Sequence, residues 1–320
     1  MRLGVLAPCL LWACAAAGPP PPSEAGGLTH GGAPASPRPE CADEPRAVGR
    51  IEDAQLNEIS GVVQSSAARD VFFVHNDSGD APRFFAIDRA GHVLAELVLE
   101  TVPILVDAED IALGPAPDGH FLYLGDTGNN FASMGQGIPR RKAVVYRVPE
   151  PVVAASARGA RIALRDVQPI VFTFPDGARD VEAFFIDPRN GELFMVGKQA
   201  DGHSQILTAD AATLAAGGGE LRLAGEILFG QGGPPGAKMP TAASIARDGS
   251  AILIRTYSSV LLFPRGPSES VMSSLQRAPR QLRAPAETQG EAIGFAEGDT
   301  AFVTISEGMN PAVYCTNLPR

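Results

Sequence analysis

The sequence predicts an all-β fold built from many short strands. Glycine (35 residues) and proline (28 residues) are abundant among the 320 residues of the chain, whereas only 19% of residues are charged. Short apolar runs recur along the chain and are bounded by glycine, aspartate and proline, as expected for strands joined by turns. Five segments also begin alike, which indicates an internal repeat.

The five similar starts predict the architecture. They lie at residues 57–61, 107–111, 180–184, 240–244 and 289–293. Four of them carry a glutamate at the matching place, namely Glu58, Glu109, Glu182 and Glu291. Successive starts are roughly 50 to 70 residues apart, which is the size of a four-stranded propeller blade. We therefore expect a five-bladed β-propeller.

Two other architectures remain as alternatives. A six-bladed propeller would need a second set of strands between Glu109 and Glu182, where the sequence offers only one. A β-sandwich would not require the same polar cluster after an apolar run five times.

The last blade needs a strand from elsewhere in the chain. Only residues 317–320 follow its third expected strand, at 312–315. We expect Val48–Leu56 to supply the missing outer strand, which closes the ring and removes an open sheet edge. Antiparallel pairing of that strand with 312–315 brings Cys41 near Cys315, so we expect a disulfide, with two free thiols as the alternative.

The N-terminus has the composition of a targeting segment. Residues 1–17 combine one early arginine, an apolar stretch too short to span a bilayer, and small residues, as in a signal peptide. The string 11–14 resembles a lipobox that would place a lipid anchor on Cys14, although Trp12 stands where a small residue is usual; ordinary cleavage near 15–17 is the alternative. Residues 18–45 form a Pro/Gly-rich linker and 46–320 the propeller domain. We expect an exported protein that is periplasmic, extracellular or a cell-surface lipoprotein.

The net charge restricts the partners. A formal charge of −10 argues against nucleic acid, whose binding requires clustered lysine and arginine. A small molecule or a cation is the expected partner, the membrane is contacted only through the Cys14 lipid, and the chain is expected to be a monomer.

Propeller geometry predicts where polar residues gather. In a blade the first strand runs along the axis and the second returns, so the start of the first and the end of the second lie at one rim. The acids expected at a metal site there are Glu58, Asp77, Glu109, Asp126, Glu182 and Glu291. The residues expected to bind a ligand are His75, Asn76, Lys198, Arg255 and Glu307. Crowded carboxylates repel one another, and a cation, the opposed Lys198 and Arg255, or raised carboxylate pKa values would relieve that repulsion.

Calcium is the metal that this residue set favours, because Ca²⁺ takes six to eight oxygen ligands. The histidines form no closely spaced pair of zinc ligands, and no Gly-x-Ser-x-Gly motif of a serine hydrolase is present. The alternative is that these acids accept hydrogen bonds from backbone N–H groups and only hold the blades together.

The polar strings resemble a known group of proteins. The segments that carry the resemblance are Val74–Gly79, Asp107–Ala112 and Tyr123–Asn130. They look like a family of exported bacterial propeller proteins over residues 56–314. The starts at 59–61 and 290–293 are more distantly similar to the SdiA-regulated and esterase-like phytase propeller families, which would imply calcium binding and phosphoester hydrolysis. The fourth start, 241–244, lacks the acid that such relatives carry.

Three functions are compatible with these observations. The first is binding of a small ligand or divalent cation in an acidic funnel at one end of the channel. The second is a calcium-dependent hydrolase of phosphorylated or otherwise anionic substrates, in which Lys198 and Arg255 would hold the anion. The third is a scaffold or interaction module at the cell surface.

Overall fold

The computed structural model describes residues 40–130, 135, 138–199, 201–230, 233–234 and 236–319. The expected signal peptide, Cys14 and most of the expected linker lie outside these residues. Residues from Pro39 to Arg320 belong to one compact unit. Within the described part of the chain, no helix is long and apolar enough to cross a membrane.

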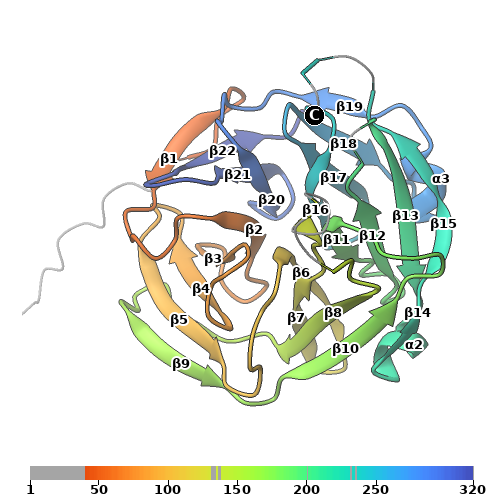
Figure 1. The fold of residues 1–320 in the computed structure, drawn as a ribbon. Coiled ribbons are helices and arrows are strands. Elements are labelled where there is room, and N and C mark those ends of the chain that lie inside the picture. Colours follow the sequence, from red (N-terminus) through yellow and green to blue (C-terminus); the bar gives the residue numbers. More distant parts are fainter. Residues whose placement is uncertain are drawn as a thin grey trace, which may run out of the picture. The chain divides into compact units, whose positions relative to one another are not determined.

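The described residues form five sheets arranged in a ring, which is the architecture of a five-bladed β-propeller (Figure 1). The innermost strands are β2 (Ile59–Gln64), β6 (Ala108–Ala116), β11 (Val181–Ile186), β16 (Pro240–Ile245) and β20 (Gly290–Ala296). The predicted fold and blade number are therefore confirmed.

The remaining strands follow outward in each sheet. The first blade adds β3 (Val71–Asn76), β4 (Arg83–Asp88), β5 (Val93–Leu99) and β9 (Ala160–Leu164). The second adds β7 (Gly119–Asp126), β8 (Lys142–Pro149), β10 (Gln168–Thr173) and β14 (Gly218–Glu220). The third adds β12 (Leu193–Gly197), β13 (His203–Ala209) and β15 (Arg222–Leu228).

The fourth blade adds β17 (Ala251–Thr256), β18 (Ser259–Pro264) and β19 (Arg280–Leu282). The fifth adds β21 (Ala301–Ser306), β22 (Ala312–Asn317) and β1 (Arg46–Arg50). Two short helices, α2 (Ala211–Ala215) and α3 (Val271–Leu275), lie in connections of the described chain.

The long interval between the second and third starts holds one extra strand. β9 pairs in parallel with β5, so it extends the first blade outward and does not begin a sixth blade. β14 extends the second blade in the same way by pairing in parallel with β10. These two strands cover the outer edges of two neighbouring sheets and thereby reduce exposed edge hydrogen-bonding groups.

The ring closes through β1, which pairs antiparallel with β22 (Figure 1). The closing strand begins and ends earlier than the expected Val48–Leu56. Beyond Arg50 the chain turns, and Leu56 donates its backbone N–H to Asp53 at 3.0 Å. Ile51 and Leu56 are fully buried in the core between the fifth and first blades, so their apolar character reflects burial in a turn and not a strand.

The expected disulfide joins Cys41 to Cys315. Their Cα atoms lie 4.8 Å apart, and Cys315 pairs with Arg46 in the closing sheet. The bridge therefore ties the chain before the closing strand to the last blade.

Apolar side chains fill the spaces between adjacent blades. Each of the five interfaces holds its own cluster of buried residues. Between the third and fourth blades, Phe185 stacks on Phe194 with ring centroids 5.4 Å apart. Burying one such side chain contributes roughly 1.5–3 kcal/mol, so these interfaces are a main source of stability.

Asp110 in β6 connects three blades near the axis. Its carboxylate accepts backbone N–H groups from Ile111 at 2.8 Å, Phe184 in β11 at 3.1 Å and Ala243 in β16 at 3.0 Å. The side chain is fully buried. Burial raises the pKa of Asp110, and the three N–H donors oppose that rise.

We predict that Asp110→Asn lowers the free energy of unfolding by at least about 2 kcal/mol, because the amide cannot accept all of these N–H groups. Urea denaturation measures the change. The exposed Asp118→Asn is the matched control and should unfold like the wild type. Equal stability of both variants would show that Asp110 does not hold the blades together.

We predict that Cys41→Ala lowers the free energy of unfolding by about 2–5 kcal/mol, because the bridge closes a very long loop. Denaturation with and without reductant measures this. Reductant should destabilise the wild type and leave Cys41→Ala unchanged. A wild type that is insensitive to complete reduction would contradict the prediction.

Candidate functional site

Three positions recur in every blade at one end of the channel. The start position precedes the innermost strand, the bulge position is the second residue of that strand, and the return position follows the second strand. Each return residue donates its backbone N–H to the carbonyl oxygen of the start residue, at 2.7–3.3 Å. The start residues are Glu58, Asp107, Asp180, Met239 and Gln289. The return residues are Asp77, Thr127, Lys198, Tyr257 and Glu307.

The bulge positions carry the glutamates. The pairing of the first two strands shifts register by one residue at the same place in each blade. The residues at these bulges are Ser60, Glu109, Glu182, Thr241 and Glu291. A β-bulge turns a side chain away from the regular alternation, which is how such sites are often built.

This register corrects the alignment of the starts. Glu58 is not the equivalent of Glu109, since Ser60 holds the bulge position in the first blade and Glu58 the start position. In the fourth blade the bulge residue is Thr241. Ser60 and Thr241 instead join neighbouring blades, because their hydroxyl groups donate to the carbonyl oxygens of Glu109 at 2.6 Å and Gly290 at 3.0 Å.

The three positions together form an acidic funnel. Its cavity of about 270 Å³ is lined by Glu58, Asp77, Ser78, Asn130, Glu182, Lys198, Tyr257, Gln289, Glu291 and Glu307. Six of the predicted site acids and bases, Glu58, Asp77, Glu182, Lys198, Glu291 and Glu307, therefore line one cavity. Among the described residues of this lining, Lys198 is the only basic one.

Two groups of three acidic residues each, here called the carboxylate groups, adjoin the funnel, and Glu109 belongs to both. Asp77, Asp107 and Glu109 each offer an oxygen within 4.8 Å of the others, and so do Glu109, Asp180 and Glu182. Glu109 and Glu182 are almost completely buried. These buried acidic groups can hold a metal ion, because each supplies three oxygen ligands at short mutual distances.

The chain after β7 passes directly over this pair of groups. A Cβ atom at Gly128 would lie 1.9 Å from Glu109 Oε1 and 2.6 Å from Asp107 Oδ2, so a larger residue would displace these carboxylates. Asn130 donates its backbone N–H to Asp107 Oδ2 at 2.9 Å and its side-chain amide to Glu109 Oε1 at 3.3 Å. Asp107 Oδ1 is buried and has no hydrogen-bond partner among the described residues. A buried acceptor without a donor is costly unless a cation or water satisfies it.

Lys198 partly balances the charge. Its Nζ lies 2.6 Å from Glu182 Oε1 and 5.6 Å from the centroid of the Tyr257 ring. Burial lowers the pKa of Lys198, but Glu182 and the other nearby acids outweigh it, so the pKa lies above its usual value. Lys198 is therefore a fixed positive charge in the wall.

The acids hold protons more strongly than usual. Burial, followed by repulsion from Glu307, raises the pKa of Glu291 to about 8. Burial and Asp107 raise the pKa of Asp77 to about 7, and burial and Glu58 raise the pKa of Glu307 to about 7.

Burial is also the first cause that raises the pKa values of Glu109 and Glu182 well above the usual range. The pKa of Asp107 is raised mainly by burial. Lys198 alone thus does not neutralise the acids of the funnel, and a bound cation would lower the electrostatic energy of these acids.

Two predicted ligand residues lie outside the lining of the funnel. His75 is fully buried, and its Nδ1 lies 2.8 Å from the carbonyl oxygen of Asn76, which requires Nδ1 to donate. Burial lowers the pKa of His75 to about 4, so the ring is neutral. Asn76 holds the loop before the first blade, because its amide donates to the carbonyl of Gln55 at 2.6 Å and to Asp80 Oδ2 at 2.9 Å.

Asp126 and Arg255 also lie outside that lining. Asp126 accepts the backbone N–H of Asp107 at 3.0 Å and the guanidinium of Arg140 at 2.8 Å, which fixes the chain before β6. Arg255 pairs with Glu287 at 2.5 Å, and both side chains are buried. Of the two cations expected to hold an anion, the funnel is therefore lined by Lys198 alone.

Sequence reasoning did not assign Asp107, Asp180, Asn130, Tyr257 or Gln289 to the site. Asp107, Asp180 and Gln289 occupy start positions and Tyr257 a return position, whereas Asn130 lies in the loop that follows the return residue Thr127. The available signal was positional: the residue just before each innermost strand and the one just after each second strand.

We predict that stability falls as pH rises from 6.5 to 8.5 in the presence of chelator. Asp77, Glu291 and Glu307 keep protons in the folded state up to pH 7–8, whereas the unfolded chain releases them near pH 4–4.5. The folded state therefore binds more protons, and its advantage is lost as pH passes through these values.

His75 acts in the opposite direction, but only between pH 4 and 6.5, below the tested range. Denaturation at several pH values measures the slope. Glu291→Gln should make the slope shallower, whereas the exposed Glu100→Gln should not. A stability that is flat or rising in this range would contradict the prediction.

Comparisons with known proteins identify no family for the chain. No protein-family profile matches the chain, and no curated protein matches it. Among solved structures, the hydrazine synthase of Kuenenia stuttgartiensis is 15% identical with a TM-score of 0.39, over 78% of this chain and 56% of that one. The chain thus spans little more than half the length of that protein.

Two further structures match at similar levels. The protein U3-55K is 13% identical with a TM-score of 0.42, over 87% of this chain and 99% of the other. A structure of a nidogen/laminin complex is 12% identical with a TM-score of 0.41, over 78% and 73%. These three neighbours are propeller-like proteins of low identity, and they do not link the chain to the SdiA-regulated or phytase families.

Proposed function

We propose that the protein binds a divalent cation, and specifically Ca²⁺, in the acidic funnel. The observation that supports this is the pair of buried carboxylate groups that share Glu109, beside an Asp107 oxygen without a donor. The ligands are Asp77, Asp107, Glu109, Asp180 and Glu182, with Asn130 and other oxygen atoms of the lining completing the shell.

The donor set favours calcium over other metals. The residues of the two groups offer oxygen and neither histidine nitrogen nor thiolate, which disfavours zinc and copper. Mg²⁺ requires a nearly ideal octahedron and retains several waters, whereas Ca²⁺ accepts irregular shells of six to eight oxygens.

We further propose that the chain acts outside the cytoplasm as a monomer. The Cys41–Cys315 bridge is consistent with an oxidising compartment. The expected signal peptide and the alternative lipid anchor on Cys14 support the same location.

A second candidate function is calcium-dependent hydrolysis of a phosphorylated or anionic substrate. The observation that favours it is Lys198, which lies in the same lining as the acids and next to Tyr257. A cation and a lysine side by side can bind an anion and stabilise developing negative charge. Turnover of phosphomonoesters that disappears with chelator would favour the hydrolase over a binding protein or a scaffold.

We predict that calcium raises the melting temperature through binding to the folded state. At a free concentration about 100 times the Kd, the gain is about 2.7 kcal/mol, or roughly 5 °C for a domain of this size. Glu109→Gln should abolish the shift, because both carboxylate groups lose their shared ligand. Calorimetry with calcium and with chelator measures it.

The matched control is Glu100→Gln, an exposed carboxyl paired with Arg165 on the outer surface, which should keep the full shift. If the acids only hold the blades together, calcium does nothing and Glu109→Gln destabilises the metal-free protein. If they form a cation site, the same variant is as stable as the wild type, or more stable, in chelator. The change in stability caused by Glu109→Gln in chelator therefore distinguishes the two cases.

A further inference from the structure

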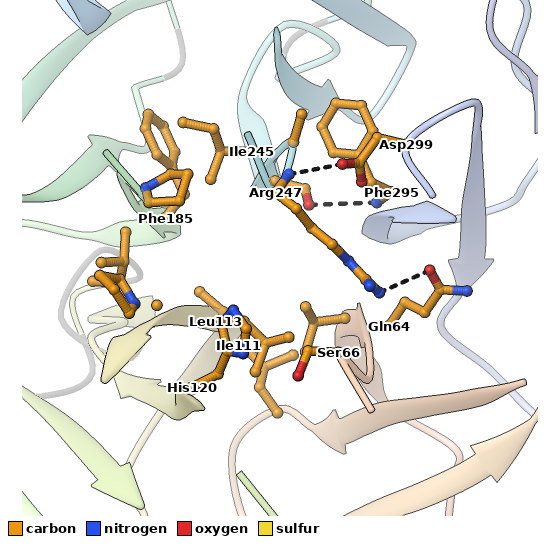
Figure 2. Close-up of a pocket in the computed structure, with 18 of the residues that line it drawn as sticks. Gln64, Ser66, Ile111, Leu113, His120, Phe185, Ile245, Arg247, Phe295 and Asp299 are labelled. Carbon is orange, nitrogen blue, oxygen red and sulfur yellow. Dashed lines mark hydrogen bonds between the residues drawn. The ribbon is translucent and has the colours of Figure 1, made fainter. Parts of the chain in front are cut away.

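The central channel has a second cavity at its opposite end. The acidic funnel lies at the beginnings of the innermost strands, whereas this cavity of about 170 Å³ lies at their other ends (Figure 2). We call it the apolar mouth. Its walls include Val63, Leu113, Phe185, Ile245 and Phe295, one from each innermost strand.

The two ends are separate sites. Glu291 in the funnel and Phe295 in the apolar mouth are four residues apart on β20, which corresponds to about 13 Å along a strand. Asp110 crosses the channel between them by bonding to Phe184 and Ala243. A ligand in one cavity therefore does not touch the other.

The size and walls of the apolar mouth define the body of a ligand. A cavity of about 150 Å³ lined by aliphatic and aromatic side chains is large enough to bind benzene. The apolar mouth is slightly larger, and its lining combines such side chains with the polar residues Gln64, Ser66, His120, Ser244, Arg247 and Asp299. It fits a single six-membered ring with a small substituent.

Arg247 defines the polar end of the ligand. It is exposed at the rim, and Figure 2 shows its side chain extending along one wall toward Gln64. Its Nη2 donates to Gln64 Oε1 at 3.1 Å and to the carbonyl oxygen of Ser65 at 2.8 Å, while its backbone N–H donates to Asp299 Oδ2 at 2.9 Å. These bonds fix the guanidinium in place.

The remaining donors of Arg247 are open to a ligand. Nε and Nη1 form no hydrogen bond with any described residue, and no described carboxylate lies within 4.0 Å of the guanidinium. Asp299 is the one acid of the lining, and it accepts the Arg247 backbone N–H. A guanidinium has only donors and matches the two oxygens of a carboxylate.

We propose that the apolar mouth binds a small carboxylate with a single apolar ring, with the ring in the cavity and the carboxylate on Arg247. Apolar burial supplies most of the binding free energy, and the arginine selects for an anion at the rim. The site is independent of the acidic funnel and of the cation proposed there.

Benzoate and its neutral analogue benzamide test the proposal, with binding followed by saturation-transfer NMR titration. Benzoate should bind more tightly than benzamide. Arg247→Gln should weaken benzoate binding roughly tenfold, as expected for loss of a charged hydrogen bond. The same variant should leave the affinity for benzamide nearly unchanged. Leu113→Phe, which fills the cavity from a half-buried position, should weaken both.

Glu291→Gln in the funnel is the control and should leave the affinities for benzoate and benzamide unchanged. Circular dichroism verifies that each variant is folded, and Leu113→Phe gives an independent result if Arg247→Gln is not. The proposal is overturned if benzoate does not bind, if it binds no better than benzamide, or if Leu113→Phe has no effect. Failure of calcium to bind the funnel would leave these outcomes unchanged.

Discussion

One backbone hydrogen bond, repeated in each blade, determines where the chemistry of this protein lies. The residue after the second strand donates to the residue before the first, and the register bulge follows two residues later. Because the bond fixes three positions per blade, residues far apart in the chain meet at one rim. Glu58 and Glu307, for example, lie in the same lining although 249 positions separate them in the numbering. The funnel is thus a consequence of blade geometry, and its character depends only on which side chains occupy those positions.

The occupants are unevenly distributed around the ring. The second and third blades place acids at both the start and bulge positions, whereas the fourth places Met239 and Thr241 there. With the return positions included, the first, second, third and fifth blades each supply two acids to this end of the channel, and the fourth supplies none. Buried like charges at short range are unfavourable unless protons, Lys198 or a cation compensate them, and the raised pKa values of these carboxyls express that cost. The bridging hydroxyls of Ser60 and Thr241 show what the same position does when it serves only to join blades.

The sequence predicted the ring of five blades, but it did not predict the strand register or the side-chain partners within the ring. Five similar starts predicted five blades, and the pairing of the last strand predicted the Cys41–Cys315 bridge, because both depend on topology. Glu58 lines the funnel as predicted, but its alignment with Glu109 was wrong by two positions, because a bulge is set by hydrogen-bond register. His75 and Arg255 have the chemistry of site residues, but burial against Asn76 and pairing with Glu287 remove them from the lining. Such partners are far away or ordinary in sequence and become visible only in three dimensions.

Opposite chemistry at the two ends of the same strands has a physical basis. At the starts, the bulges break the strand alternation and point carboxylates inward, so polar groups gather there. Toward the other ends regular pairing resumes, and apolar side chains such as Phe185 and Phe295 lie near the axis. Asp110 stands at the transition and satisfies backbone N–H groups that would otherwise face the channel. This carboxylate thus lies between the acidic funnel and the apolar mouth, so one ring of strands presents cavities of different chemistry at its two ends.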